Sequence, residues 1–278
     1  DFQNDQVMMR AVSDGGNSLY TDNDYMSAAF AANLVGGAGL ASFDEIQLEK
    51  YLSDKQLSLS PYIGELNEGM NGNFSPKDAE TFFQLVHLYF TQPRIDDKVF
   101  QSNMNFLKSI FPTLLNDPDR WFGNEVSNYL YDGSIRRKGI FSEKEMDMAK
   151  ADRALEIFKE RFADANDFTF FFVGNFEVEA FKNLLTTYLA TLPVKDGEEN
   201  WNDPNIVEKP GSLNQTFNKG QEPKSQVRLR YRGDLKWKGK ERSHVKALSE
   251  ALSIMLVESL REEIGGVYSP RAFSSYQS

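Results

Sequence analysis

Cysteine is absent from this 278-residue chain, and histidine occurs at two positions, His87 and His244. Without thiols the chain can form no disulfide and cannot bind a metal through sulfur. A hydrolytic zinc site takes three protein ligands, usually rich in histidine. A Ser–His or Cys–His pair needs an imidazole beside its nucleophile. The shortage of both residue types predicts that the chain has no catalytic metal site and no nucleophilic triad of its own.

Positive charge and long apolar runs are also scarce. The 41 acidic residues outnumber the 31 basic ones, so the net charge is −10. An acidic surface repels phosphate backbones, and we therefore expect no nucleic-acid partner. No apolar run approaches the roughly 18 residues that a membrane span needs. Hydrophobic residues nevertheless make up 40% of the chain, with 22 phenylalanines, which excludes disorder of the whole chain.

Each histidine has an ordinary interpretation. His87 lies in the apolar helical stretch Gln84–Phe90, where a core histidine with a hydrogen bond is expected. His244 follows Glu241 near the start of a charged helix, where we expect a solvated face. The chain contains neither a His-x-x-Glu-His motif nor a Gly-x-Ser-x-Gly elbow. Gly36–Gly39 lacks the spacing of a dinucleotide-binding loop, so we interpret this stretch as the end of a helix.

The order of the expected elements favours an α+β fold, with helices layered on one face of a mixed β-sheet. Ser42 with Glu45, and Ser142 with Glu145, match the capping box that begins a helix. The β-branched and aromatic run at 167–173 favours a strand buried on both faces. By residue range, we expect strands at 6–12, 57–63, 65–74 and 167–173, and helices at 24–35, 76–93, 96–116, 118–131, 142–162 and 177–190.

Residues 195–212 are expected to be a domain linker, because they begin with charged residues and contain Pro204, Pro210 and Gly211. The linker would separate a first domain, 1–194, from a second unit, 213–278. In that second unit we expect a strand at 226–232 and a helix at 240–263, followed by a strand-like tail. The repeated strand–helix order hints at a duplicated architecture, and the second unit is short enough to be truncated.

The most informative stretch is Leu260–Ser269, with the sequence Leu-Arg-Glu-Glu-Ile-Gly-Gly-Val-Tyr-Ser. A helix ends near Arg261, two glycines turn the chain, and the turn can place Tyr268 beside Arg261. Guanidinium and phenol both donate hydrogen bonds, so together they can bind a peptide carbonyl or a developing oxyanion. The alternative is a surface arginine and a half-buried tyrosine at a helix–strand junction.

The same stretch resembles the Leu-Arg-Glu-x-x-Gly-x-x-Tyr segment in the non-catalytic half of the pitrilysin and insulysin type of zinc peptidases, whose catalytic motif is the inverted His-x-x-Glu-His. Nearly the whole chain takes part in the resemblance, because further stretches follow in the expected order. Three of them, Asp14–Tyr20, Tyr89–Arg94 and Arg161–Asp164, resemble the third domain of four-domain bacterial members. The fourth, Phe168–Asn175 followed by Leu184–Pro193, resembles the strand, Val-Gly turn and helix of these enzymes.

The resemblance implies a clamshell of two halves, in which the N-terminal half carries zinc and the C-terminal half closes over the peptide. Residues 1–194 would be the third domain and residues 213–278 the start of the fourth. The chain by itself would be inactive and bind no zinc, which the absent half would hold. Arg261 would hold a substrate carbonyl or carboxylate, and the Tyr268 hydroxyl would help to stabilise the tetrahedral intermediate. By helix position, small residues replace the zinc ligands at Ala28, Ala31 and Ala32.

The implied partners are the N-terminal catalytic half of the same polypeptide and a peptide substrate. The absence of cysteine fits a cytosol, a periplasm or an extracellular site equally well, whereas the resemblance favours a bacterial, periplasmic or exported parent. Because the chain begins at Asp1 without a methionine and ends at Ser278 without a stop signal, we expect both ends to be cut, with any signal peptide upstream. Two alternatives remain open: a non-catalytic scaffold subunit, and a free-standing peptide-binding domain.

Overall fold

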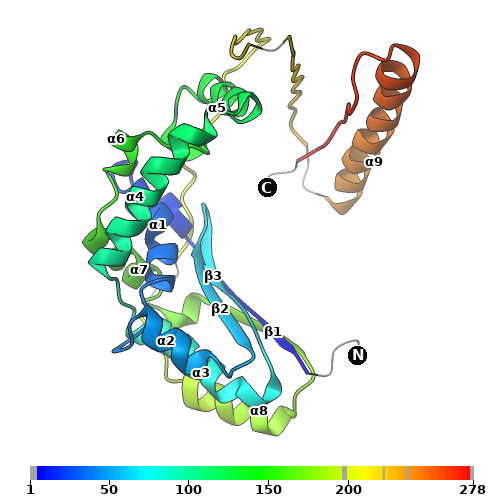
Figure 1. The fold of residues 1–278 in the computed structure, drawn as a ribbon. Coiled ribbons are helices and arrows are strands. Elements are labelled where there is room, and N and C mark those ends of the chain that lie inside the picture. The colour runs from blue at the N-terminus through cyan, green and yellow to red at the C-terminus, as the bar shows by residue number, and fades with distance from the viewer. Residues whose placement is uncertain (1–4, 196–198, 222, 236–237, 276–278) are drawn as a thin grey trace. The chain divides into compact units, whose positions relative to one another are not determined.

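The computed structural model describes residues 5–195, 199–221, 223–235 and 238–275. It divides into two compact units, which we call unit 1 (up to residue 222) and unit 2 (from residue 223) (Figure 1). The expected cut ends and residues 196–198 of the expected linker lie outside the described residues. The rest of that linker belongs to unit 1, and its described part contains no regular helix or strand.

Unit 1 is built on a four-stranded sheet in the order β2-β3-β1-β4. The α+β class is confirmed, but the expected mixed sheet is wrong, because every described pair is antiparallel. A short turn joins β2 to β3, which requires an antiparallel pair, and β1 runs antiparallel to both β3 and β4. The strands are β1 (Val7–Asp14), β2 (Leu57–Ile63), β3 (Asn67–Phe74) and β4 (Thr169–Gly174).

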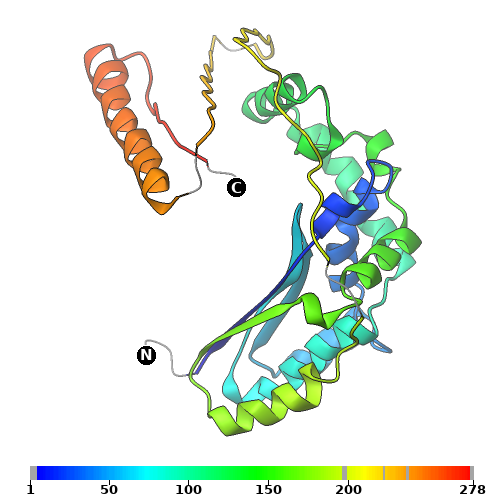
Figure 2. The same cartoon turned by 180° about the vertical axis from the view of Figure 1, so that it is seen from behind.

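Helices cover one face of this sheet, with α3 and α8 lying along it in both views (Figures 1 and 2). No helix in the described part of the chain is long and apolar enough to cross a membrane. The helices are α1 (Tyr25–Gly36), α2 (Glu45–Leu52), α3 (Ala79–Thr91), α4 (Asp97–Leu114), α5 (Pro118–Leu130), α6 (Glu143–Met146), α7 (Ala151–Arg161), α8 (Val178–Leu184) and α9 (Gly239–Leu256).

Phenylalanine rings fill the space between the sheet and the helices. Phe83 of α3 is fully buried, and its ring lies 6.1 Å from that of Phe74 on β3, 5.5 Å from Phe172 on β4 and 5.4 Å from Phe181 on α8. Such edge and tilted pairs add about 0.5–1.5 kcal/mol each to the stabilisation from burial alone. The cluster therefore binds the late elements β4 and α8 to the early part of the chain.

The expectation that residues 167–173 are buried on both faces is wrong. Along β4, Phe171 is 53% exposed and Val173 is 63% exposed, whereas Phe170 and Phe172 point toward the helices and are half-buried. The strand lies at the edge of the sheet and has helices on one side, so its side chains alternate between core and solvent.

The expected capping box at Ser42 is also wrong. The N-cap of helix α2 is Asp44, whose side chain accepts the Gln47 N–H at 2.8 Å while the Gln47 side chain accepts the Asp44 N–H at 3.0 Å. Leu40 and Phe43 exchange backbone hydrogen bonds in a tight turn. Because this turn includes Ser42, the helix cannot start before Asp44.

The single helix expected over 142–162 is interrupted. The capping box of Ser142 and Glu145 is confirmed, but α6 ends at Met146 and α7 begins at Ala151. Between them Lys150 has an extended backbone, with φ −126° and ψ 131°, and its N–H donates to Ser27 Oγ of α1 at 3.0 Å. This contact holds the segment between the two helices against α1.

In unit 2 the long helix is confirmed as α9, which continues as a π-helix, Val257–Glu263. The expected strand at 226–232 and the strand-like tail are wrong, because neither segment is a strand in the described residues. A strand needs a hydrogen-bonded neighbour, and no described segment of unit 2 supplies one. Val227 and Leu229 stay 81% and 75% exposed.

A buried network of charged and polar groups joins two of the segments that carry the resemblance. Arg161 donates from Nε to the Tyr20 hydroxyl at 2.9 Å and from Nη2 to Glu199 Oε1 at 2.7 Å. Its Nη1 lies 3.7 Å from Oε1 of Glu68, which is completely buried on β3. The other Glu68 oxygen accepts the N–H of Gly16. Gly16 has φ +64°, and a Cβ there would lie 2.6 Å from the Glu65 carbonyl oxygen, so glycine is required.

Burial raises the pKa of Glu68 to about 8, although the Gly16 N–H and the charge of Arg161 act to lower it. The carboxylates of Glu199 and Asp14 raise it further. The folded protein thus keeps the Glu68 proton across a range of pH in which an exposed glutamate is ionised. Burial likewise raises the pKa of Tyr20.

We expect the stability of the protein to fall between about pH 4.5 and pH 8, because the folded state holds the Glu68 proton up to about pH 8 and the unfolded chain releases it near pH 4.5. One such proton gives a slope of at most about 1.4 kcal/mol per pH unit. Glu68→Gln cannot titrate, so it should lose this part of the slope in urea unfolding measured from pH 5 to pH 8.

The matched control is Glu179→Gln on α8, where the side chain is 85% exposed. This variant should keep the pH dependence of the unmodified protein. If Glu68→Gln shows the unmodified slope as well, Glu68 does not bind a proton differently in the folded and unfolded states.

Candidate functional site

The candidate site lies in unit 2, where the π-helix Val257–Glu263 ends. Gly265 takes a positive φ of +65°, which glycine adopts without strain. The Gly266 N–H then donates to the Leu260 carbonyl at 3.1 Å, as in the turns that commonly end helices. The two glycines therefore reverse the chain and return the following residues toward the last helical turn.

This turn brings Arg261 and Tyr268 together. The guanidinium carbon of Arg261 lies 5.2 Å from the centre of the Tyr268 ring, within the range of a cation–π contact. Arg261 Nε also lies 3.4 Å from Glu262 Oε1. Tyr268 is 82% exposed rather than half-buried, and it lies on irregular backbone rather than on a strand.

The pair offers hydrogen-bond donors to solvent. A guanidinium has five N–H donors in a planar fork and a phenol has one O–H. Arg261 remains 47% exposed while it contacts the ring, so several of its donors face outward. Donors of this kind can hold a carbonyl or a carboxylate, and they bind an oxyanion more strongly than a neutral carbonyl.

The histidines do not contribute a metal site. His87 is half-exposed on α3, with Nδ1 3.4 Å from Thr91 Oγ1 and its ring 6.5 Å from that of Tyr188. It is therefore not the core histidine that the apolar stretch predicts, because it lies at the margin of the buried face of α3. His244 is exposed on α9. Within the described residues no three His, Cys, Asp or Glu side chains gather where they could hold a metal, so this part of the chain does not fit a zinc ion.

Three alanines of α1 lie in the buried core of unit 1. Ala28 and Ala31 are completely buried and Ala32 is 6% exposed, on a helix that contacts α7 and β2. Because alanine carries only a methyl group, α1 can approach α7 and β2 closely, and a larger side chain would overpack the space between them. The face of α1 that the resemblance aligns with metal ligands is thus part of the core.

Glu68 is a buried acidic residue whose burial the sequence analysis does not predict. The alternation of residues in strand 65–74 could have indicated this burial. Glu68, Met70 and Phe74 share one face of β3, and all three are buried. Its partner Arg161 belongs to a stretch that carries the resemblance, yet nothing in the sequence shows that the two meet.

Comparison with known proteins places these features in a family. Residues 141–278 match the family described as the peptidase M16 inactive domain. The chain is 24% identical over 268 residues to the protein named Probable zinc protease PqqL of Haemophilus influenzae, and 23% identical over 266 residues to the protein of that name in Escherichia coli. Each alignment covers 95% of this chain and 28% of the relative, so the chain spans little more than a quarter of these relatives.

A solved structure has the same fold. The crystal structure described as the periplasmic protease PqqL from Escherichia coli matches with a TM-score of 0.78 and 21% identity, over 96% of this chain and 29% of that one. This match shows the fold, and the match to the inactive-domain family confirms the resemblance to the non-catalytic half of pitrilysin-type peptidases. Residues 141–278, which include both Arg261 and Tyr268, thus match the inactive-domain family of the M16 peptidases.

Proposed function

We propose that this chain is a zinc-less, peptide-holding part of a larger zinc endopeptidase and is inactive by itself. The observation that carries the proposal is the contact between Arg261 and Tyr268, 5.2 Å apart within the M16 inactive-domain match. Relatives named as zinc proteases are much longer than this chain. The remainder of such a parent has room for a half that holds the metal, and this remainder and a peptide are the partners that we assign to the chain.

In this proposal Arg261 and Tyr268 position the scissile region of the peptide. The guanidinium fork holds a backbone carbonyl or a carboxylate. The Tyr268 hydroxyl donates to the carbonyl oxygen, and this hydrogen bond strengthens as the oxygen gains negative charge in the transition state. Zinc in the parent would be bound by the half outside this chain. We further propose that residues 1–194 and 213–278 correspond to the third domain and the start of the fourth.

A periplasmic or exported, bacterial parent is part of the same proposal. Its support is the solved relative described as a periplasmic protease. A second candidate function is a non-catalytic scaffold subunit, favoured by the match to an inactive domain. The sequence of the parent distinguishes the two, since a peptidase requires an upstream His-x-x-Glu-His with a downstream glutamate and a scaffold does not.

Purified alone, the chain should bind no stoichiometric zinc and cleave no peptide. The described residues bring no three ligands together, and hydrolysis of this type depends on a metal that activates water. Metal analysis by mass spectrometry after gel filtration, with a quenched fluorescent peptide as substrate, checks both points. One tightly held zinc per chain would refute the proposal.

In the parent enzyme, Tyr268→Phe should lower kcat by about 10²-fold, as expected for loss of an oxyanion donor, and change KM little. Tyr231→Phe is the matched control, because Tyr231 also lies in unit 2 and is 89% exposed; its kcat should be unchanged. Steady-state kinetics on a peptide substrate separates the two constants. A Tyr268→Phe enzyme with normal kcat removes this hydroxyl from the mechanism.

A further inference from the structure

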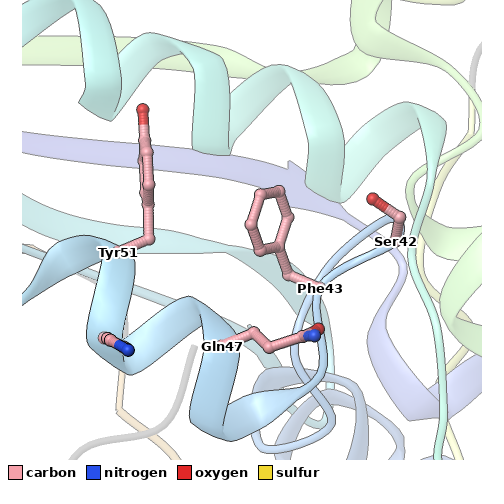
Figure 3. A pocket seen from close by; sticks show the side chains of 5 residues that line it. Ser42, Phe43, Gln47 and Tyr51 are labelled. Atoms are coloured by element: carbon pink, nitrogen blue, oxygen red, sulfur yellow. The ribbon is translucent and has the colours of Figure 1, made fainter.

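A shallow hollow on unit 1 has no part in the function proposed above. It has a volume of about 530 Å³ and is formed by helix α2 and the loop that precedes it. Figure 3 shows the rings of Phe43 and Tyr51 standing side by side on the same side of this segment. The lining side chains are Ser42, Phe43, Gln47, Lys50 and Tyr51.

The loop that carries Phe43 is held rigidly. Arg94 Nη1 donates to the Phe43 carbonyl at 2.7 Å, and the Ala41 N–H donates to the Gln92 carbonyl at 3.1 Å. Ala41 has a φ of +52°, which costs a non-glycine residue about 1 kcal/mol or more. A strained backbone persists where surrounding contacts hold it, and such positions cluster at binding sites.

One wall of the hollow is aromatic and open to solvent. The Phe43 and Tyr51 rings lie 5.8 Å apart at 39° to each other, and they are 39% and 51% exposed. These two rings form an exposed apolar surface of the kind that binds an apolar group.

The polar groups of the hollow are mostly donors. Lys50 supplies an ammonium, and in the described part of the chain no carboxylate pairs with it. The Gln47 carbonyl oxygen already accepts the Asp44 N–H, which leaves its NH₂ group to donate outward. Glu45 and Glu49 each lie two positions from Gln47, so they project from the far side of the helix. A cation beside two rings thus faces solvent on a protein of net charge −10.

We propose that this hollow binds an extended peptide segment in which a large apolar side chain adjoins a carboxylate. The apolar side chain lies against Phe43 and Tyr51, and the carboxylate is held by Lys50 and the Gln47 amide. The hollow belongs to unit 1, so it adds a second peptide contact whether or not Arg261 and Tyr268 act as proposed.

The test is fluorescence polarisation with the complete 278-residue chain and a fluorescein-labelled peptide that contains Glu-Phe-Glu between glycines and serines. We expect saturable binding that weakens as salt is added. The Glu-Ser-Glu peptide should bind about tenfold more weakly because it lacks the apolar side chain. The Gln-Phe-Gln peptide should bind a few-fold more weakly because it loses an exposed ion pair, which contributes less. Equal affinity for all three peptides overturns the proposal, as does a lack of binding.

Substitutions in the hollow test whether the peptide binds there. Phe43→Ala should weaken binding of the acidic peptide about tenfold, and Lys50→Glu should weaken it a few-fold. Lys159→Glu is the matched control for charge, because Lys159 also lies in the last turn of a helix, and Phe106→Ala is the control for an exposed ring, at 60% exposure. Both controls should bind as the unmodified chain does. Loss of affinity in the controls equal to that in the site variants, or normal affinity in the site variants, refutes the assignment.

Discussion

The ion pairs and hydrogen bonds of Arg161 hold unit 1 together, because a buried guanidinium must find partners. Removing a charge from water costs several kcal/mol unless an opposite charge and hydrogen bonds compensate. Groups from three regions meet this demand. Glu199 supplies the opposite charge, the Tyr20 hydroxyl near the start of the chain accepts a hydrogen bond, and the protonated Glu68 on β3 lies 3.7 Å from the guanidinium. The position of Arg161 at the end of α7 therefore determines where each of these regions can lie.

The irregular segment that follows Glu199 is also held by contacts with the rest of unit 1. Although residues 199–221 have no regular structure, Phe217 places its ring 6.1–6.4 Å from those of Trp121, Phe122 and Tyr129. The backbone N–H of Lys209 also donates to the Leu130 carbonyl at 2.9 Å. Irregular backbone is thus fixed to α5 by side chains, and unit 1 extends beyond the region that its composition marks as a linker.

These contacts explain which features could be predicted from the sequence. Local signals sufficed for the elements with a clear period and cap, such as α6 with Ser142 and the hairpin of β2 and β3. They failed where the outcome depends on a distant partner. Residues 226–232 alternate like a strand, but a strand also needs a neighbour. The hydrogen bond between Lys150 and Ser27 joins residues far apart in the sequence, and no local pattern reveals it.

The same reasoning applies to the candidate site. The two glycines predicted that Arg261 and Tyr268 could meet, and the turn brings them together, but their exposure could not be read from the sequence. In water a hydrogen bond from an exposed donor contributes little, since solvent competes for the same carbonyl. In the function we propose, a second surface closes over the pair and excludes water, which strengthens its electrostatic interaction with a developing charge. This proposal accounts for the exposure of both side chains, because a pair that acts only on closure is open to solvent before a second surface covers it.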